Sequence, residues 1–180
     1  MRQLPEFSDE LPNAVLAEEM DTPGKGQIKA MLLVGGNPVL STPNGTRLDA
    51  AMGQLDFCVA VDFYINESTR HAHLILPPVT VWERSHFEVA VNAVQVRNVA
   101  RYSSAAFATP AQGKEDWQIL TELLARVERH RSWLGALTGP LRLAASRLLK
   151  PDRLLALALR LGPQRKALSL DSLRRADATV

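Results

Sequence analysis

The chain has 180 residues, of which 46% are apolar and 22% are charged, and it contains a single cysteine. These values are ordinary for one soluble domain with an appendage. One cysteine excludes a disulfide, a zinc site or an iron–sulfur cluster built from the cysteines of this chain alone. The first twenty residues lack the apolar run of a signal peptide or a membrane span, so we expect a cytoplasmic protein with no membrane span.

The two ends of the chain differ in charge. Residues 1–125 hold 9 Lys and Arg against 15 Asp and Glu, whereas residues 126–180 hold 12 against 4. The tail is therefore basic, although the formal charge of the whole chain is only +2. Such a shift predicts a boundary near residue 126 and two surfaces that suit different partners.

The first half of the chain alternates between short apolar runs and segments with helical spacing. The run over residues 28–34 is nearly continuous, ends at two glycines, and predicts a strand buried on both faces. The single cysteine, Cys58, lies in the run Phe57–Val61, where we expect a buried, inert thiol. In chain order, the predicted elements are a short helix over 10–20, a strand over 28–34, a helix over 46–55, a strand over 57–61, a helical turn over 66–72 and a strand over 73–76.

Further along the chain, the Val-rich segment Val89–Val99 predicts an edge strand or a hairpin. An amphipathic helix is predicted from Lys114 onward, with one apolar face formed by Trp117, Leu120, Leu124 and Val127. The tail is rich in Leu and Arg, and its prolines predict short helices of about ten residues rather than one rod. These prolines are Pro140, Pro151 and Pro163.

This order of elements predicts an α/β fold. We expect a Rossmann-like, doubly wound, mainly parallel sheet with helices on both faces, followed by a basic tail of short helices. The expected domains are a leading segment over residues 1–27, an α/β cofactor-binding domain over 28–130 and a helical Leu/Arg-rich tail over 131–180. In such sheets, ligands bind beyond the carboxyl ends of the strands.

The turn Gly35-Gly36-Asn37-Pro38 follows the first predicted strand. Its glycines permit close backbone approach, its amide offers hydrogen bonds, and its proline fixes the direction in which the chain leaves. Backbone N–H groups in such a turn suit a phosphate or a ribose. Taken alone, the turn is equally consistent with a simple chain reversal, and it matches neither the GxGxxG nor the GxxxxGK spacing.

Asp62 leaves the carboxyl end of the second predicted strand and is followed by Phe-Tyr-Ile-Asn-Glu-Ser-Thr. A carboxylate at this position can accept two N–H bonds from the edge of guanine, or pair with ribose hydroxyls. The competing interpretation is that Asp62 caps a short helix and that Thr69 bonds to its own backbone.

Three histidines, His71, His73 and His86, lie in sequence near Glu83 and Glu88. A proline pair separates them, and their spacing does not match the HExxH pattern of zinc enzymes. Nor does the chain offer a convincing pairing of a nucleophile with a base. We therefore assign no metal ligand and no catalytic residue.

Four motifs in order resemble the third domain of the large subunits of molybdopterin-dependent oxidoreductases, the group of formate dehydrogenases, nitrate reductases and dimethyl sulfoxide reductase. The family pattern is an apolar strand, GxNPxxxxP, a helix, a strand ending in Asp, an ETxxxAD element and a VLPP-type stop. The matching residues are Gly36-Asn37-Pro38 with Pro43, then Asp62, then Asn66-Glu67-Ser68-Thr69, and finally Leu74 to Pro78.

The resemblance implies that this domain binds one guanine dinucleotide arm of the molybdenum cofactor, molybdopterin guanine dinucleotide. It implies cofactor contacts for the turn and the post-strand Asp, and a bracing role for the loop that follows. The implied residues are Gly35, Gly36, Asn37, Pro38, Asp62, Asn66, Glu67 and Thr69. Glu83 matches a further acidic position, whereas His73 replaces the family's usual Asp, which we expect to weaken local hydrogen bonding or alter the charge of the loop.

Family enzymes also need domains that supply the metal ligand, further cofactor contacts and often an iron–sulfur cluster, and these do not fit in 180 residues. We therefore expect a fragment or separately encoded part of an oxidoreductase, not catalytic alone, whose partner is the remaining domains or another chain. The alternative is a non-enzymatic α/β module whose basic tail binds a protein partner, an anionic membrane or nucleic acid. Nucleic acid is disfavoured because the tail has few aromatic residues.

Overall fold

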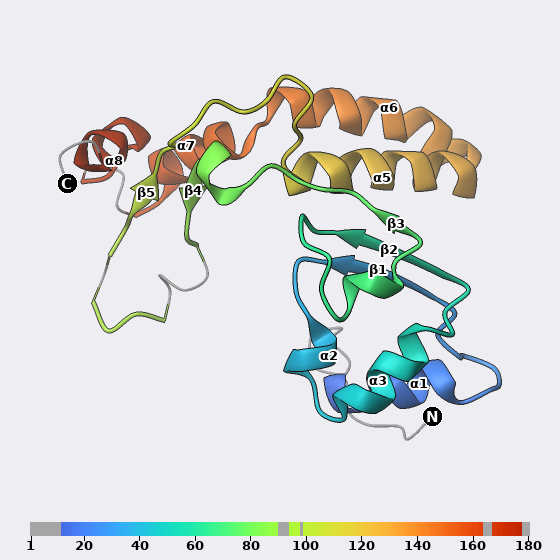
Figure 1. Cartoon of the computed structure of the whole chain (residues 1–180). Coiled ribbons are helices and arrows are strands. Elements are labelled where there is room, and N and C mark those ends of the chain that lie inside the picture. The colour runs from blue at the N-terminus through green and yellow to red at the C-terminus, as the bar shows by residue number, and fades with distance from the viewer. Residues whose placement is uncertain (1–11, 90–93, 98, 164–166, 178–180) are drawn as a thin grey trace. The chain divides into compact units, whose positions relative to one another are not determined.

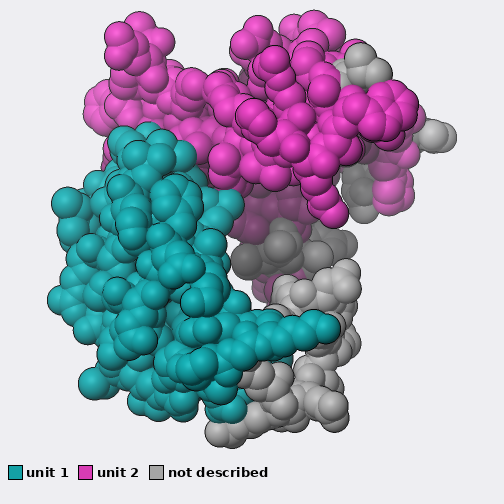
Figure 2. Space-filling view, turned by 90° about the vertical axis from the view of Figure 1, so that its right-hand side faces the viewer, with its two compact units in different colours: residues 1–78 teal, residues 79–180 magenta. Residues whose placement is uncertain are grey.

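The computed structural model describes residues 12–89, 94–97, 99–163 and 167–177 (Figure 1). The chain separates into two compact units, residues 1–78 (unit 1) and residues 79–180 (unit 2) (Figure 2). The domain limits expected from the sequence, after residues 27 and 130, stay predictions, because a compact unit need not coincide with an inherited domain.

Unit 1 is built on a three-stranded parallel sheet. Its strands are β1 (Ala30–Val34), β2 (Phe57–Val61) and β3 (Leu74–Ile75), in the order β1-β2-β3. The first two strands run in register over their full length, from Ala30 opposite Phe57 to Val34 opposite Val61. All three strands were predicted from the sequence, and the mixed α/β character of the fold is confirmed.

Short helices connect these strands and precede them. The predicted helix over residues 10–20 forms as a 3-10 turn, η1 (Asn13–Val15), continued by α1 (Leu16–Asp21). The predicted helix over 46–55 is α3 (Gly45–Met52), and the predicted turn over 66–72 is η2 (Thr69–His71). A further short helix, α2 (Pro38–Ser41), was not predicted. It begins with proline at its first position, where the missing N–H has no helical partner to lose.

The core of unit 1 lies between one face of the sheet and the helices α1 and α3 (Figure 1). Leu48 and Met52 of α3 are completely or almost completely buried there, against Met20 of α1 and Cys58 of β2. Burial raises the pKa of the Cys58 thiol. The buried position expected for Cys58 is therefore observed, and a raised pKa disfavours the reactive thiolate.

The prediction that the first strand is buried on both faces is wrong. Leu33 is 6% exposed, whereas Leu32 and Val34 are 45% and 43% exposed, because the described helices of unit 1 cover only the face that carries Leu33. Successive side chains of a strand point to opposite faces, so one cover protects only every second residue. A second helical layer, and with it the Rossmann-like doubly wound arrangement, stays a prediction.

Unit 2 combines a small antiparallel ribbon with helices. The ribbon pairs β4 (His86–Phe87) with β5 (Tyr102–Ser103). Of the segment Val89–Val99, in which a strand or hairpin was predicted, residues 90–93 and 98 lie outside the described residues. The observed strand pair flanks that segment on either side. The helical elements are η3 (Val81–Glu83), α5 (Asp116–Arg131), α6 (Trp133–Leu148), α7 (Pro151–Leu161) and α8 (Leu170–Asp177).

Helices α5 and α6 form a closely packed hairpin (Figure 1). A Cβ on Gly135 would overlap the carbonyl oxygen of Glu128, and a Cβ on Gly139 would come within 2.8 Å of that of Ala125. The two glycines of α6 therefore let the backbones approach closely. A salt bridge of 2.7 Å from Arg142 to Glu128 adds a polar contact between the two helices.

The prediction that Pro140 ends a helix is wrong, because α6 runs through it. A proline inside a helix removes one backbone hydrogen bond and crowds the preceding turn. The neighbouring Gly139 packs closely against α5, so tertiary contact supports the helix at this site. Pro151 behaves as expected and starts α7 at its first position. In the part of the chain that is described, no helix has the length and apolar composition needed to cross a membrane.

Candidate functional site

The carboxyl ends of β1 and β2 bring two sequence-distant loops together. Val34 pairs with Val61 at the last position of the two strands, and the N–H of Gly35 donates to the carbonyl oxygen of Val61 at 3.0 Å. The glycine turn and Asp62 therefore leave the same edge of the sheet side by side. This is the edge at which parallel α/β sheets bind ligands.

The glycine turn needs glycine because of its backbone conformation. Gly35 and Gly36 have φ angles of +52° and +134°, in the region that side chains other than hydrogen disfavour. No atom lies within 4 Å of the position that a Cβ would take at either residue. Among the described residues, no hydrogen bond uses the N–H of Gly36 or of Asn37. The turn therefore has two backbone donors with no partner among the described residues, and no side chain crowds its glycines, which suits an anion.

A buried serine ties the glycine turn to the loop after β2. The Ser68 side chain is completely buried; its hydroxyl donates to Asn37 Oδ1 at 2.6 Å and accepts the N–H of Val39 at 3.0 Å. Asn37 Nδ2 in turn donates to Glu67 Oε2 at 2.6 Å. Both polar ends of the Asn37 amide are thus held by the second loop, so its orientation is fixed.

The second loop is braced by its own side chains. Asn66 Oδ1 accepts the N–H groups of Ser68 and Thr69 at 3.0 and 2.9 Å. The Thr69 hydroxyl donates to the carbonyl of Tyr64 and accepts the N–H of Asn66, both at 2.8 Å. Hydroxyl and amide side chains commonly close turns in this way. The Thr69 hydroxyl thus bonds to the backbone of nearby residues, and not to that of Thr69 itself as the competing interpretation predicted.

The sequence-based list of site residues omitted Ser68, although the Asn-Glu-Ser-Thr motif contains it. Its residue type was a weak signal, because serine is common in exposed loops. Only the structure shows that its hydroxyl lies between the two loops, with both a donor and an acceptor used.

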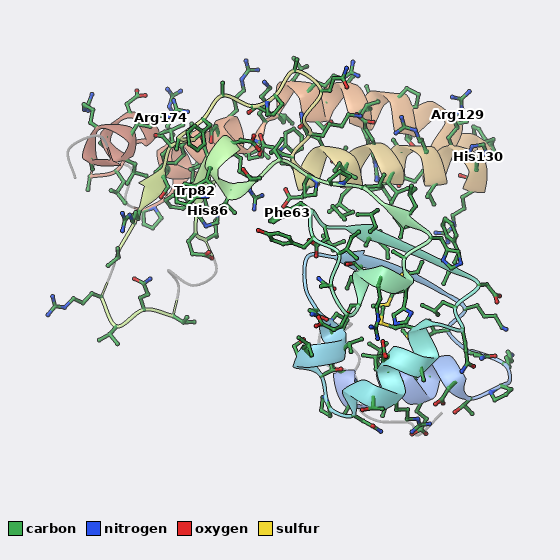
Figure 3. The ribbon with its side chains drawn as sticks, viewed as in Figure 1. Phe63, Trp82, His86, Arg129, His130 and Arg174 are labelled. Atoms are coloured by element: carbon green, nitrogen blue, oxygen red, sulfur yellow. The ribbon has the colours of Figure 1, made fainter. Side chains whose placement is uncertain are left out.

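Asp62 is 9% exposed, and its Oδ1 accepts the N–H of Tyr64 at 3.0 Å. This bond closes a local turn, not the helix cap of the competing interpretation, because the next helical element, η2, begins only at Thr69. Within the described residues, Oδ2 receives no hydrogen bond, so one oxygen of a nearly buried carboxylate stays available to a donor. The rings that follow, Phe63 and Tyr64, are 44% and 68% exposed and lie 4.7 Å apart. The ring of Phe63 extends away from the ribbon (Figure 3).

Carboxylates in unit 1 are held ionised by specific donors. Hydrogen bonding from the Asn37 amide lowers the pKa of Glu67. At the opposite side of the loop, Asp49 accepts two short bonds from Arg70 and one of 2.6 Å shared with His71, and these contacts lower the pKa of Asp49. The loop between β2 and β3 is therefore anchored at Glu67 and at Arg70 and His71 by charge-assisted hydrogen bonds.

The remaining histidines have separate local roles. His73 Nδ1 accepts the N–H of Cys58 at 3.1 Å, so the ring supplies an acceptor at the position where the resemblance implied Asp. His86 belongs to β4 in unit 2, and its Nε2 lies 3.4 Å from Glu88 Oε2. Within the described ranges, no three His, Cys, Asp or Glu side chains are placed to hold a metal.

Glu83, the acidic residue after the VLPP-type stop, caps a helix. Its Oε2 accepts the N–H and the hydroxyl of Thr80 at 2.9 and 3.0 Å, which closes a capping box around η3. Its carboxylate therefore stabilises the start of unit 2.

Unit 2 contains a hollow of about 470 Å³ that sequence reasoning did not anticipate. Its lining is mostly apolar and includes Phe87, Leu154 and Leu155. The indole N–H of Trp117, also in the lining, is buried and has no hydrogen-bond partner among the described residues. None of the residues proposed from the sequence for cofactor binding lies there.

Comparison with known proteins identifies a family to which most of the chain is similar. Residues 6–126 match the family described as Molybdopterin oxidoreductase. The chain is 31% identical over 125 residues to the assimilatory nitrate reductase catalytic subunit of Bacillus subtilis, which covers 68% of this chain and 17% of that protein. It is 31% identical over 103 residues to the NADPH-Fe(3+) oxidoreductase subunit alpha of Geobacter sulfurreducens, covering 57% of this chain and 12% of that protein.

A third relative is the F420-dependent formate dehydrogenase subunit alpha of Methanocaldococcus jannaschii, 28% identical over 118 residues, or 64% of this chain and 17% of that subunit. The chain thus spans less than a fifth of the length of these relatives. The family match covers both sheet loops and more than half of the chain, so this chain belongs to the molybdopterin oxidoreductase family.

Proposed function

We propose that unit 1 binds one guanine dinucleotide arm of the molybdenum cofactor, as part of a larger oxidoreductase. The observation that carries the proposal is the shared sheet edge, where the open N–H groups of Gly36 and Asn37 lie beside the nearly buried carboxylate of Asp62. Anionic and hydrogen-bonding groups of a nucleotide would find complementary partners on these two adjacent loops.

The two loops suit different parts of a nucleotide. The turn Gly35 to Pro38 offers backbone donors without side-chain obstruction, which fits phosphate or ribose oxygens. Asp62 offers an acceptor, which fits the adjacent N–H groups on the edge of guanine and disfavours adenine, whose corresponding edge presents a ring nitrogen that cannot donate. Asn66, Glu67, Ser68 and Thr69 hold the two loops in this arrangement and need not touch the ligand.

We propose no metal-centred reaction for the isolated chain. When bound in a complete enzyme, the cofactor supplies the redox chemistry, and the protein supplies binding, orientation and electrostatics. Unit 1 would contribute binding free energy to one arm only. We therefore propose that turnover requires the remaining domains or a partner chain.

Nucleotide protection of the whole 180-residue chain tests the proposal. We expect GDP to raise the melting temperature more than ADP at equal concentration, because only guanine donates to Asp62. Asp62→Asn should weaken GDP binding roughly 10- to 100-fold, as expected for loss of a charge-assisted hydrogen bond, and should remove the preference over ADP.

Asp56→Asn is the matched control. Asp56 precedes β2 at the opposite end of the strand, and its side chain is 67% exposed. This variant should keep the preference for GDP. Equal protection by GDP and ADP in the unmodified chain, or an unchanged preference in Asp62→Asn, would contradict the proposal.

A further inference from the structure

Helix α7 has an unusual outer face. At 100° per residue, Leu154, Leu157 and Leu161 fall on one stripe, and they are 47%, 51% and 74% exposed. Leu155 and Leu159, on the opposite side, are partly buried. The helix therefore has one partly buried apolar face and a second, more exposed apolar stripe, of which Leu154 also borders the hollow of unit 2. The outward side of a surface helix is normally polar.

Two arginines border the exposed stripe. Arg153 and Arg160 lie seven residues apart and hence on the same side of α7, next to Leu157. Neither forms a salt bridge in the described part of the chain, and the Arg153 guanidinium donates only to the backbone carbonyl of Leu148 at 2.9 Å. We call these five residues the leucine–arginine face. They are Arg153, Leu154, Leu157, Arg160 and Leu161.

Among the described residues, no carboxylate forms a salt bridge with Arg153 or Arg160. The only acidic residue of α7 is Asp152, which accepts hydrogen bonds from the hydroxyl of Tyr102 at 3.0 Å and from the guanidinium of Arg174 at 2.7 Å. Two further cations, Arg147 and Lys150, precede α7 and also form no salt bridge among the described residues. The leucine–arginine face thus joins exposed apolar side chains to uncompensated positive charge.

We propose that the leucine–arginine face binds the surface of an anionic lipid bilayer, with α7 lying in the plane of the headgroups. A bilayer interface offers acyl chains for the leucines and phosphate groups for the arginines at the same depth, which is how amphipathic interfacial helices bind. Nucleic acid would satisfy the arginines but leave the leucines in water. A second copy of the chain would bring like charges together.

The proposed binding is peripheral and reversible. A single short helix with three leucines buries little area, so the arginines must contribute a comparable share, roughly a fivefold gain in partitioning for each cation near an anionic surface. Binding should therefore need anionic lipid and should weaken with added salt. This inference uses only residues of unit 2 and does not depend on cofactor binding by unit 1.

Vesicle sedimentation with the whole chain tests this inference. The probes are unilamellar vesicles of phosphatidylcholine alone and of phosphatidylcholine mixed with about one third of anionic phosphatidylglycerol, each at low and at physiological salt. We expect binding to the anionic vesicles only. Arg153→Gln with Arg160→Gln should lower partitioning roughly 25-fold, and Leu154→Ser with Leu157→Ser and Leu161→Ser should lower it to background.

Two control variants make comparable changes, of two arginines and of two leucines, elsewhere in unit 2. Arg126→Gln with Arg129→Gln removes two charges from α5, and Leu134→Ser with Leu141→Ser removes two leucines of α6 that are 55% and 70% exposed. Both should keep most of the binding, and circular dichroism should show an unchanged helix content in every variant.

Three results would overturn the inference. One is absence of binding to anionic vesicles at low salt. Another is loss of binding in the arginine variant but not in the leucine variant, which would indicate a purely electrostatic polyanion site. The third is equal loss in the α5 and α6 control variants, which would show that the leucine–arginine face has no special role.

Discussion

Units 1 and 2 bury their apolar side chains to different extents. Among the described residues, ten of the fourteen buried apolar residues belong to unit 1, whereas seventeen of the twenty-five large apolar side chains that are exposed belong to unit 2. Unit 1 also buries a polar side chain, Ser68, with its hydrogen bonds satisfied. A core with satisfied polar groups specifies one arrangement of loops, whereas an exposed apolar surface is typical of a region that binds something else.

Truncation of one leucine in each unit should give the largest difference in the free energy of unfolding. Leu48 of α3 is completely buried, whereas Leu157 of α7 is 51% exposed. Leu48→Ala should lower the free energy of unfolding by about 2–5 kcal/mol because it leaves a cavity, and Leu157→Ala should change it by less than about 0.5 kcal/mol. Urea unfolding followed by circular dichroism measures both. Equal losses would show that α7 is more deeply packed than the structure indicates.

Two serines provide a sharper comparison of polar groups. Ser68→Ala should cost about 1–3 kcal/mol, because it leaves Asn37 Oδ1 and the N–H of Val39 without their partner. Ser146 of α6 donates to the carbonyl of Leu143 from a partly exposed position, so Ser146→Ala should be nearly neutral. The same urea titration applies. A neutral Ser68→Ala would mean that the loop network does not hold the two loops together.

The smallest expected effect distinguishes the causes of two lowered pKa values. Donation from the neutral Asn37 amide lowers the pKa of Glu67, whereas donation from the charged Lys114, with help from Arg126, lowers that of Glu122. Each carboxylate should contribute stability at pH values above its unfolded pKa, and this contribution is lost as pH falls through the lower folded pKa.

Added salt should change the pKa values of Glu67 and Glu122 to different extents. At high ionic strength the pKa of Glu122 should return toward its ordinary value, because its partners are charged and accessible, whereas that of Glu67 should change less. Carbon-13 NMR titration of the glutamate carboxyl groups at low and high salt measures both. Asn37→Ala should remove most of the lowering at Glu67 and leave Glu122 unchanged. Equal salt sensitivity at the two sites would contradict this assignment.

Local patterns in the sequence were sufficient for most elements of unit 1. The apolar runs before Gly35 and before Asp62 predicted β1 and β2, and helical spacing predicted α3. Their alternation also placed Gly35–Pro38 and Asp62 at one edge, because parallel strands end on the same side of a sheet. These inferences succeeded because strand and helix periods are short-range properties.

Burial and polar pairing depended on tertiary structure. A run such as Met31-Leu32-Leu33-Val34 does not reveal whether one face or two will be covered, and Pro140 does not reveal that glycines beside it pack against α5. Likewise, Ser68 became a site residue only when the fold placed it against Asn37. The sequence by itself therefore determined the elements, the family resemblance and the charge of the tail. Only the tertiary structure decided which side chains are covered and which loops are joined, because those contacts link residues far apart in the chain.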